Sequence, residues 1–145
     1  MKANVRISGI VFNKGKIALV KHKNSYNGTY YLLPGGGLER DETIEECVAR
    51  EVKEEIGLDV EVKNLAYYED VVSKDDHTLH LVFRCEIIGG KVENLDPDKK
   101  VKEIVFLSEE KFKEVKFFPK KLKEKLFPEK DEKLPISLGK TPFPE

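Results

Sequence analysis

The 145-residue chain has no tryptophan, one methionine and two cysteines, and its 26 basic residues nearly cancel its 27 acidic ones. A net charge of −1 provides no overall basic field for nucleic acid, so an anionic ligand has to be bound locally. Cys47 and Cys85 fit neither CxxC nor Cys/His spacing, which disfavours a zinc site or disulfide framework and favours reduced thiols in a cytoplasmic protein. No run approaches the roughly eighteen apolar residues of a membrane span, and no signal peptide is expected.

Apolar runs separated by turn residues predict strands on both sides of one central helix. The turn residues 13–15 favour a hairpin between the first two strands. Two short helices are predicted near the C-terminal end, at Glu109–Val115 and Pro119–Phe127. The predicted strands are Val5–Phe12, Lys16–Lys23, Tyr30–Leu33, Asp59–Ser73, His77–Ile88 and Glu103–Leu107. This order favours the α+β class, with a mixed sheet flanked by helices.

The central helix is expected at Glu42–Ile56. Asp41 is a plausible N-cap, and Gly57 suits the left-handed position after the last turn. An apolar stripe with a spacing of four residues would pack one side of the helix: Ile44, Val48, Val52 and Ile56.

The domain is expected to span residues 1–127, followed by a proline-containing tail at 128–145. The prolines and Gly139 predict that this tail forms no regular structure. Its apolar residues leave open whether it packs on the domain, packs on a second subunit or is disordered.

Three carboxylates follow a triple-glycine turn at helical spacing. Glu51, Glu54 and Glu55 fall on one side of the predicted helix, behind residues 35–37. Like charges this close repel one another, and hard divalent ions such as Mg²⁺ prefer oxygen ligands. The cluster therefore predicts a metal site, and the glycines let a ligand approach the backbone.

These residues resemble the Nudix box in full. Its matched positions are Gly36, Glu42, Arg50, Glu51, Val52, Glu54, Glu55, Gly57 and Leu58. The resemblance implies an α/β/α sandwich in which the three glutamates and the Gly36 carbonyl bind Mg²⁺ or Mn²⁺. It also implies that one glutamate takes a proton from water, without saying which.

The same resemblance extends to residues around the metal. Glu42 and Arg50 would brace the loop and helix by an ion pair. Glu103, which follows the 96–98 loop and begins a strand, is a further candidate at the metal or the water, with a solvated strand end as the alternative.

The substrate residues are less defined by the sequence. Tyr30, Tyr31 or Tyr67 could stack on a base, although a strand aromatic is commonly a core residue. His77 and His80 are read as alternating on one strand face, without a third partner at metal spacing.

The resemblance implies a metal-dependent hydrolase that cleaves the diphosphate linkage of a nucleoside diphosphate joined to another group, with water as nucleophile. Nucleoside triphosphates lead the expected substrates, followed by ADP-ribose-like compounds and dinucleoside polyphosphates. Ser73 and Lys74 stand where relatives specialised for ADP-ribose often carry a proline, which disfavours that subclass. Tyr67 comes too early for the tyrosine of many dinucleoside polyphosphate hydrolases.

Two alternatives remain open: a non-catalytic nucleotide-binding or partner-binding module, and an RNA 5′-end pyrophosphohydrolase. The second would need a basic groove, and the dense lysines alternate with glutamates, as on a solvated helix surface. These lysines are Lys113, Lys116, Lys120, Lys121, Lys123 and Lys125. We therefore expect a small nucleotide as the partner, neither a membrane nor nucleic acid, and leave a homodimer open.

Overall fold

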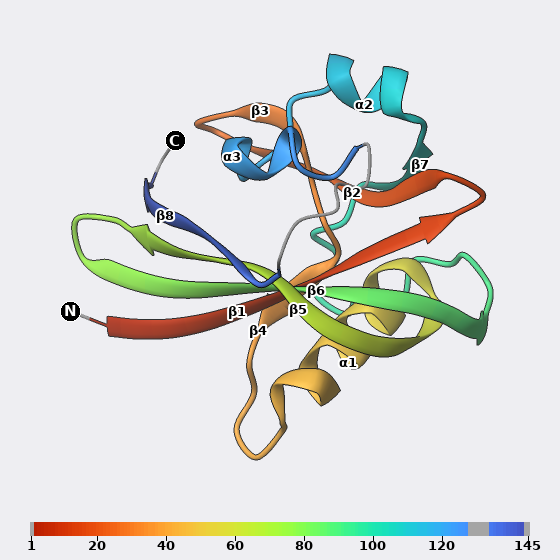
Figure 1. Ribbon diagram of the computed structural model, residues 1–145, viewed down its shortest axis with the longest axis horizontal. Coiled ribbons are helices and arrows are strands. Elements are labelled where there is room, and N and C mark those ends of the chain that lie inside the picture. The colour runs from red at the N-terminus through yellow and green to blue at the C-terminus, as the bar shows by residue number, and fades with distance from the viewer. Residues whose placement is uncertain (1, 128–133, 144–145) are drawn as a thin grey trace.

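A mixed sheet of eight strands forms the centre of the computed structural model, which describes residues 2–127 and 134–143 (Figure 1). Its main path runs β3-β2-β1-β6-β5-β8, with β4 added to β1 and β7 to β2. The β1–β6 and β5–β8 pairs are parallel and the others antiparallel. The strands are β1 (Lys2–Asn13), β2 (Lys16–Asn24), β3 (Gly28–Leu32), β4 (Gly35–Gly37), β5 (Leu58–Val72), β6 (Asp76–Gly90), β7 (Glu103–Leu107) and β8 (Ile136–Pro142). The expected mixed sheet is confirmed.

The β1–β2 hairpin forms as predicted, but its ladder is short. It comprises only the Phe12–Ile17 and Asn13–Lys16 pairs. Beyond them, β1 runs between β4 and β6, whereas β2 runs between β3 and β7. The predicted triple-glycine turn is itself a short strand, which pairs with β1 at residues 6–8.

Helix α1 (Ile44–Ile56) begins two residues later than expected because Thr43, and not Asp41, is its N-cap. The Thr43 side chain accepts a hydrogen bond from the Glu46 N–H, and the Glu46 carboxylate accepts one from the Thr43 N–H. This capping box satisfies two N–H groups that the helix cannot bond internally. Asp41 instead has a φ of 69° in the preceding loop. At the other end, Gly57 adopts the expected left-handed conformation, with a φ of 81°.

Helices cover both faces of the sheet, and each face has its own hydrophobic core. The predicted stripe of α1, with Val48, Val52 and Ile56 fully buried, packs on one face against Ile7 and Val20. On the opposite face lie α2 (Glu109–Glu114) and α3 (Lys120–Lys123) (Figure 1). Their Phe112 and Leu122 pack against Ile10, Leu19 and Tyr67. Helix α3 is shorter than the predicted Pro119–Phe127, because residues 124–127 form turns.

The C-terminal segment contains the strand β8, so the prediction that no regular structure follows residue 127 is wrong. β8 pairs in parallel with β5 at the sheet edge (Figure 1). Edge strands tolerate proline and glycine, and here Pro142 ends the strand while Gly139 has a φ of 76°. Residues 128–133 and 144–145 lie outside the described part of the chain. The segment packs on the domain and brings Thr141 beside β5.

None of the described helices is long and apolar enough to cross a membrane. Cys47 and Cys85 are free thiols, so the expectation that neither forms a disulfide agrees with the structure. Burial raises the pKa of both thiols to about 12.

Candidate active site

The glycine strand β4 lies directly against the carboxylates of α1. A β-carbon added at Gly36 would collide with the Glu51 carboxylate, so a larger residue there would displace that side chain. Glu51 is largely shielded, with its side chain 13% exposed, and burial raises its pKa in spite of the nearby Arg50. Glycine at this position thus lets the β4 backbone lie directly against the Glu51 carboxylate.

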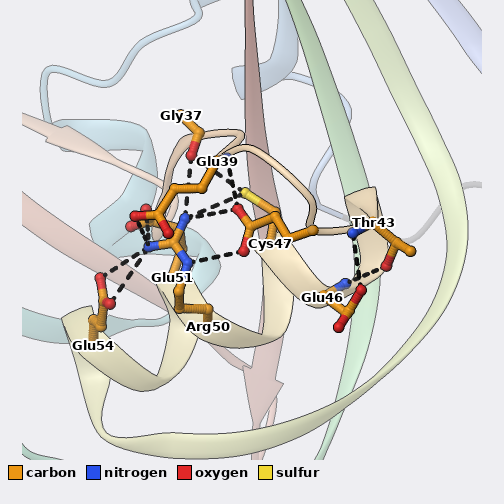
Figure 2. A network of polar contacts seen from close by, with 9 residues as sticks. Gly37, Glu39, Thr43, Glu46, Cys47, Arg50, Glu51 and Glu54 are labelled. Atoms are coloured by element: carbon orange, nitrogen blue, oxygen red, sulfur yellow. Dashed lines mark hydrogen bonds and ion pairs between the residues drawn. The ribbon is translucent and has the colours of Figure 1, made fainter.

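Arg50 lies at the centre of a polar network on the outer side of α1 (Figure 2). Its Nε and Nη2 donate to both oxygens of Glu42, at 3.0 and 2.9 Å, which is the ion pair implied by the resemblance. Its Nη1 also donates to Glu51 Oε1 at 2.9 Å and lies 3.3 Å from Glu54 Oε2. The Arg50 hydrogen bond lowers the pKa of Glu42 to about 2. Arg50 therefore binds the helix to the loop and also neutralises two of the predicted metal ligands.

Glu55 is the most buried carboxylate of the three, with the residue 6% exposed. Its Oε1 accepts one hydrogen bond, from the Gly35 N–H at 2.7 Å. Burial raises its pKa to about 7, and the Gly35 bond and the charge of Arg6 offset only part of that effect. Asp96, in the loop before β7, adds a further negative charge nearby. This concentration of negative charge favours a bound cation.

The donor set fits a divalent ion such as Mg²⁺ or Mn²⁺. It offers carboxylate oxygens and an adjacent glycine backbone, which are the ligands that hard cations prefer. Within residues 2–127 and 134–143, no three acidic, histidine or cysteine side chains already converge on one point. Glu51 and Glu54 instead contact Arg50, and Glu55 accepts a hydrogen bond from the Gly35 N–H. A bound ion would have to compete with these contacts.

The other predicted site residues lie in different surroundings. Glu103 begins β7, is 55% exposed and pairs with Lys21 at 3.5 Å. Tyr31 packs beside the core of the second sheet face, and Tyr67 lies within that core at 2% exposure. Of the three tyrosines, Tyr30 borders the cavity described next.

A cavity of about 270 Å³ opens on the sheet face opposite α1. Tyr30 and Phe118 form an aromatic wall, with ring centroids 5.6 Å apart and an interplanar angle of 62°. Leu32 and Val71 add apolar surface, and the segment after β8 contributes Phe143. Such a slot, with apolar walls and a few polar groups, suits a flat organic ring.

Arg6 connects this cavity to the carboxylates. It lines the cavity, and its neighbour in the β1–β4 register is Gly37. Its positive charge acts on both Glu51 and Glu55. Its side chain makes no hydrogen bond or ion pair with any residue that the structure describes, so the guanidinium remains available for an anion.

The polar end of the cavity is a buried chain of three side chains. Ser8 Oγ lies 2.8 Å from His80 Nε2, and His80 Nδ1 lies 3.1 Å from Glu69 Oε2. His77 instead pairs with the exposed Asp70 at 2.8 Å. The two histidines are three positions apart on β6 and point to opposite faces, so the reading that placed them on one face is wrong.

Several of these residues were not found by reading the sequence. Arg6, Ser8, Glu69 and Thr141 belong to three strands and carry no local motif, so only the strand register brings them together. In β1, an arginine and a serine within the otherwise apolar stretch Val5–Phe12 were the available signal. Glu69 offered a similar one in β5, where its neighbours in the sequence are largely apolar.

Three of the six dense lysines, Lys116, Lys121 and Lys123, donate to backbone carbonyls. Lys121 Nζ donates to the carbonyls of Leu138 and Lys140, at 2.9 and 2.7 Å. Lys123 Nζ donates to those of Lys113 and Val115. These side chains fasten loops and the strand β8 to the domain and do not form the open basic groove that RNA binding would need.

Comparison with known proteins agrees with this architecture. The NUDIX domain profile matches residues 2–130. An ADP-ribose pyrophosphatase from Methanocaldococcus jannaschii is 39% identical over 97 residues, which cover 66% of this chain and 57% of that protein. An NAD-capped RNA hydrolase NudC from Vibrio atlanticus is 39% identical over 88 residues, which cover 61% of this chain and 30% of that protein.

Solved structures show the same fold. A NUDIX hydrolase from Nitrosomonas europaea superposes with a TM-score of 0.73 at 18% identity, over 98% of this chain and 80% of that one. The family profile covers most of the chain, so the resemblance drawn from residues 36–58 is confirmed: the chain belongs to the NUDIX domain family.

Proposed function

We propose that this protein is a divalent-metal-dependent pyrophosphohydrolase whose substrate is a nucleoside diphosphate linked to a second group, with ADP-ribose-like compounds first. The observation that carries the proposal is the position of the α1 carboxylates. Glu51 and Glu55 lie against the glycine strand β4, and the charge of Arg6, which lines a cavity sized for an organic ring, acts on both. A cytoplasmic location agrees with the two free thiols.

In this proposal Glu51, Glu54 and Glu55, with the Gly36 carbonyl, hold Mg²⁺ or Mn²⁺. The ion supplies Lewis-acid neutralisation of the diphosphate oxygens and a more acidic water. Arg50 holds Glu42 and the β4–α1 loop in place, so the carboxylates are already oriented before the substrate arrives. One of the glutamates takes the proton from the attacking water.

The remaining residues orient the substrate. The Arg6 guanidinium has unused donors and a position between cavity and carboxylates, which suits a phosphate oxygen. Tyr30 and Phe118 would hold the nucleoside ring. The exposed, Lys21-paired Glu103 has a weaker case for a role at the metal or the water.

The substrate ranking differs from the one expected from the sequence. Ser73 and Lys74 disfavoured an ADP-ribose subclass, yet a relative with 39% identity is named an ADP-ribose pyrophosphatase. This chain spans 57% of that protein and 30% of the NudC relative, so their substrates enter here only as candidates. We rank ADP-ribose-like compounds first, then nucleoside triphosphates and dinucleoside polyphosphates.

An RNA 5′-end hydrolase is the second candidate, since a relative is named an NAD-capped RNA hydrolase. The lysines bound to carbonyls argue against it. A non-catalytic module is less favoured, because every position of the box is retained.

The test is product release from a panel containing ADP-ribose, other nucleotide sugars, nucleoside triphosphates, dinucleoside polyphosphates and NAD-capped RNA, with Mg²⁺, with Mn²⁺ and with chelator. Turnover should require the ion and disappear in Glu54→Gln, while the exposed Glu45→Gln should behave as the parent chain. Equal turnover in Glu54→Gln and Glu45→Gln would overturn the proposal.

A further inference from the structure

The polar end of the cavity carries a fixed negative charge. Burial lowers the pKa of His80, which keeps its imidazole neutral. Burial is the largest influence on Glu69 and would raise its pKa, but the His80 hydrogen bond, the nearby Thr141 hydroxyl and the surrounding charges together outweigh it, so that pKa is lowered and the carboxylate stays ionised. The arrangement that satisfies all three groups has Ser8 donating to His80 Nε2 and His80 Nδ1–H donating to Glu69 Oε2.

One oxygen of this carboxylate has no hydrogen bond. Glu69 is 1% exposed, and its Oε1 has no hydrogen-bond partner in the described part of the chain. Thr141, from β8, is 3% exposed, and its Oγ1 makes no hydrogen bond there either, although the hydroxyl lies close enough to Glu69 to lower the pKa of that carboxyl. Both residues line the cavity. A buried charged acceptor left unbonded is costly, so this end of the cavity suits a ligand that brings a donor.

We propose that Glu69 selects the ring bound in this cavity by accepting a hydrogen bond from its amino group, so that adenine is preferred over rings with a carbonyl oxygen at that position. This inference rests on the proposed function, because it assigns the cavity to the nucleoside of the substrate. Thr141 supplies a hydroxyl that donates to the ring nitrogen beside the amino group.

The geometry favours this role over a nucleophilic one for Ser8. The Ser8–His80–Glu69 order resembles that of a hydrolytic triad. Ser8 is only 2% exposed, however, and a β-carbon at Gly35 would collide with its hydroxyl, so the hydroxyl lies against backbone and has no room for an acyl group. Ser8 and His80 are therefore positioning residues, and Glu69 is the one that meets the ring.

Binding of AMP and IMP to the metal-free full chain tests the proposal without depending on turnover. The two nucleotides differ in the amino or carbonyl group at the ring edge that Glu69 would meet. AMP should bind at least about tenfold more tightly, because a site built around a hydrogen bond rejects the analogue that lacks the donor. Equal affinities, no detectable binding of either, or tighter binding of GMP than AMP would overturn it.

The Glu69→Gln variant gives the sharper result. With its amide oxygen held by His80, the amide nitrogen takes the position of Oε1 and becomes a donor. The AMP preference should then disappear or reverse toward IMP, and Thr141→Val should weaken AMP binding without reversing the preference. Glu61→Gln, on the exposed face of the same strand with its side chain 57% exposed, is the matched control and should keep the parent preference.

Hydrolysis separates the two proposals. Metal-dependent turnover of ADP-ribose and its hypoxanthine counterpart at equal rates, lowered equally by Glu69→Gln, would leave the hydrolase and remove the selection by Glu69. An AMP preference that Glu69→Gln reverses, with no turnover of any substrate, would leave the selection and remove the hydrolase. A loss of AMP binding accompanied by a large drop in the melting temperature of Glu69→Gln would assign the chain of three side chains to folding and overturn the selection.

Discussion

Glu55 on α1 and Glu69 on β5 are both buried carboxylates, 6% and 1% exposed, yet their pKa values move in opposite directions. Glu55 receives one backbone N–H from Gly35, which does not offset its burial. Glu69 receives the imidazole N–H of His80, and this bond, the nearby Thr141 hydroxyl and the surrounding charges together offset its burial. Burial therefore does not decide the charge of a carboxylate by itself. Glu55, with a pKa of about 7, is only partly ionised at neutral pH without a cation, whereas Glu69 is ionised without one and can serve as a fixed acceptor.

The largest expected effect is the loss of catalysis when Glu55 on α1 is replaced. Glu55→Gln should lower kcat by about 10²- to 10³-fold for every substrate, the usual cost of removing a preorganised electrostatic contact. Glu69→Gln should instead change the ratio between substrates. Steady-state rates for both variants, with Glu45→Gln as control, measure the difference. A Glu55→Gln variant that changed only the ratio would contradict the assignment.

The second expected effect concerns the stability of the metal-free protein. Because the folded-state pKa of Glu55 is raised from 4.5 to about 7, the folded state binds more protons between these pH values, and stability falls as pH rises through that interval. At 1.36 kcal/mol per unit the loss is about 3 kcal/mol. Urea denaturation with chelator on both sides of the interval measures it. Glu55→Gln should flatten the profile, and Mg²⁺ should restore stability at the alkaline side by mass action.

A profile that is unchanged by Glu55→Gln would assign the pH dependence to other groups. Glu69 offers the contrast. Its folded-state pKa is lowered, so it contributes stability at neutral pH that is lost on acidification, and Glu69→Gln should be less stable there than the parent chain.

A smaller effect is expected at Arg50, which contacts the carboxylates of α1 and has no part in the cavity. Arg50→Lys removes the two-pronged contact with Glu42 and should cost about 2 kcal/mol of unfolding free energy, the scale of hydrogen bonds to charged groups. The folded-state pKa of Glu42 is lowered to about 2 from 4.5, so the contribution of the pair is present above pH 4.5 and disappears as the pH falls toward 2. Urea midpoints of the variant and the parent should therefore converge in acid. A difference between the two urea midpoints that persists in acid would indicate lost packing and not a lost ion pair.

The carboxylate site on α1 and the cavity also differ in how much of each could be predicted from the sequence. Residues 36–58 are contiguous, so spacing alone brought together Glu51, Glu54 and Glu55 with the glycine turn. The α1 start was misplaced, because Asp41 was preferred as N-cap although Thr43 and Glu46 have the spacing of a capping box. Elements with strong periodicity were found, and β7 agrees with its predicted range.

The cavity could not be predicted in this way. Ser8, Glu69, His80 and Thr141 are brought together by pairing of β1 with β6, β6 with β5 and β5 with β8. No local pattern encodes a register across strands that are sixty or more residues apart. β8 itself was missed because proline and glycine were taken as excluding a strand, which holds for central strands and not for edge strands.

The smallest expected effect tests whether ligand binding in the cavity depends on the strand β8. Lys121 Nζ donates to the carbonyls of Leu138 and Lys140 on β8, so Lys121→Met should leave two partly exposed carbonyls to water and cost about 1 kcal/mol or less. Lys111→Met, at an exposed position of α2, is the matched control. Because β8 carries Thr141, the Lys121 variant should also bind AMP more weakly, while metal-dependent behaviour at α1 stays as in the parent chain. Calorimetric titration with AMP and with Mg²⁺ on the same samples separates the two regions. Equal losses in both titrations would mean that β8 supports the whole domain and not the cavity in particular.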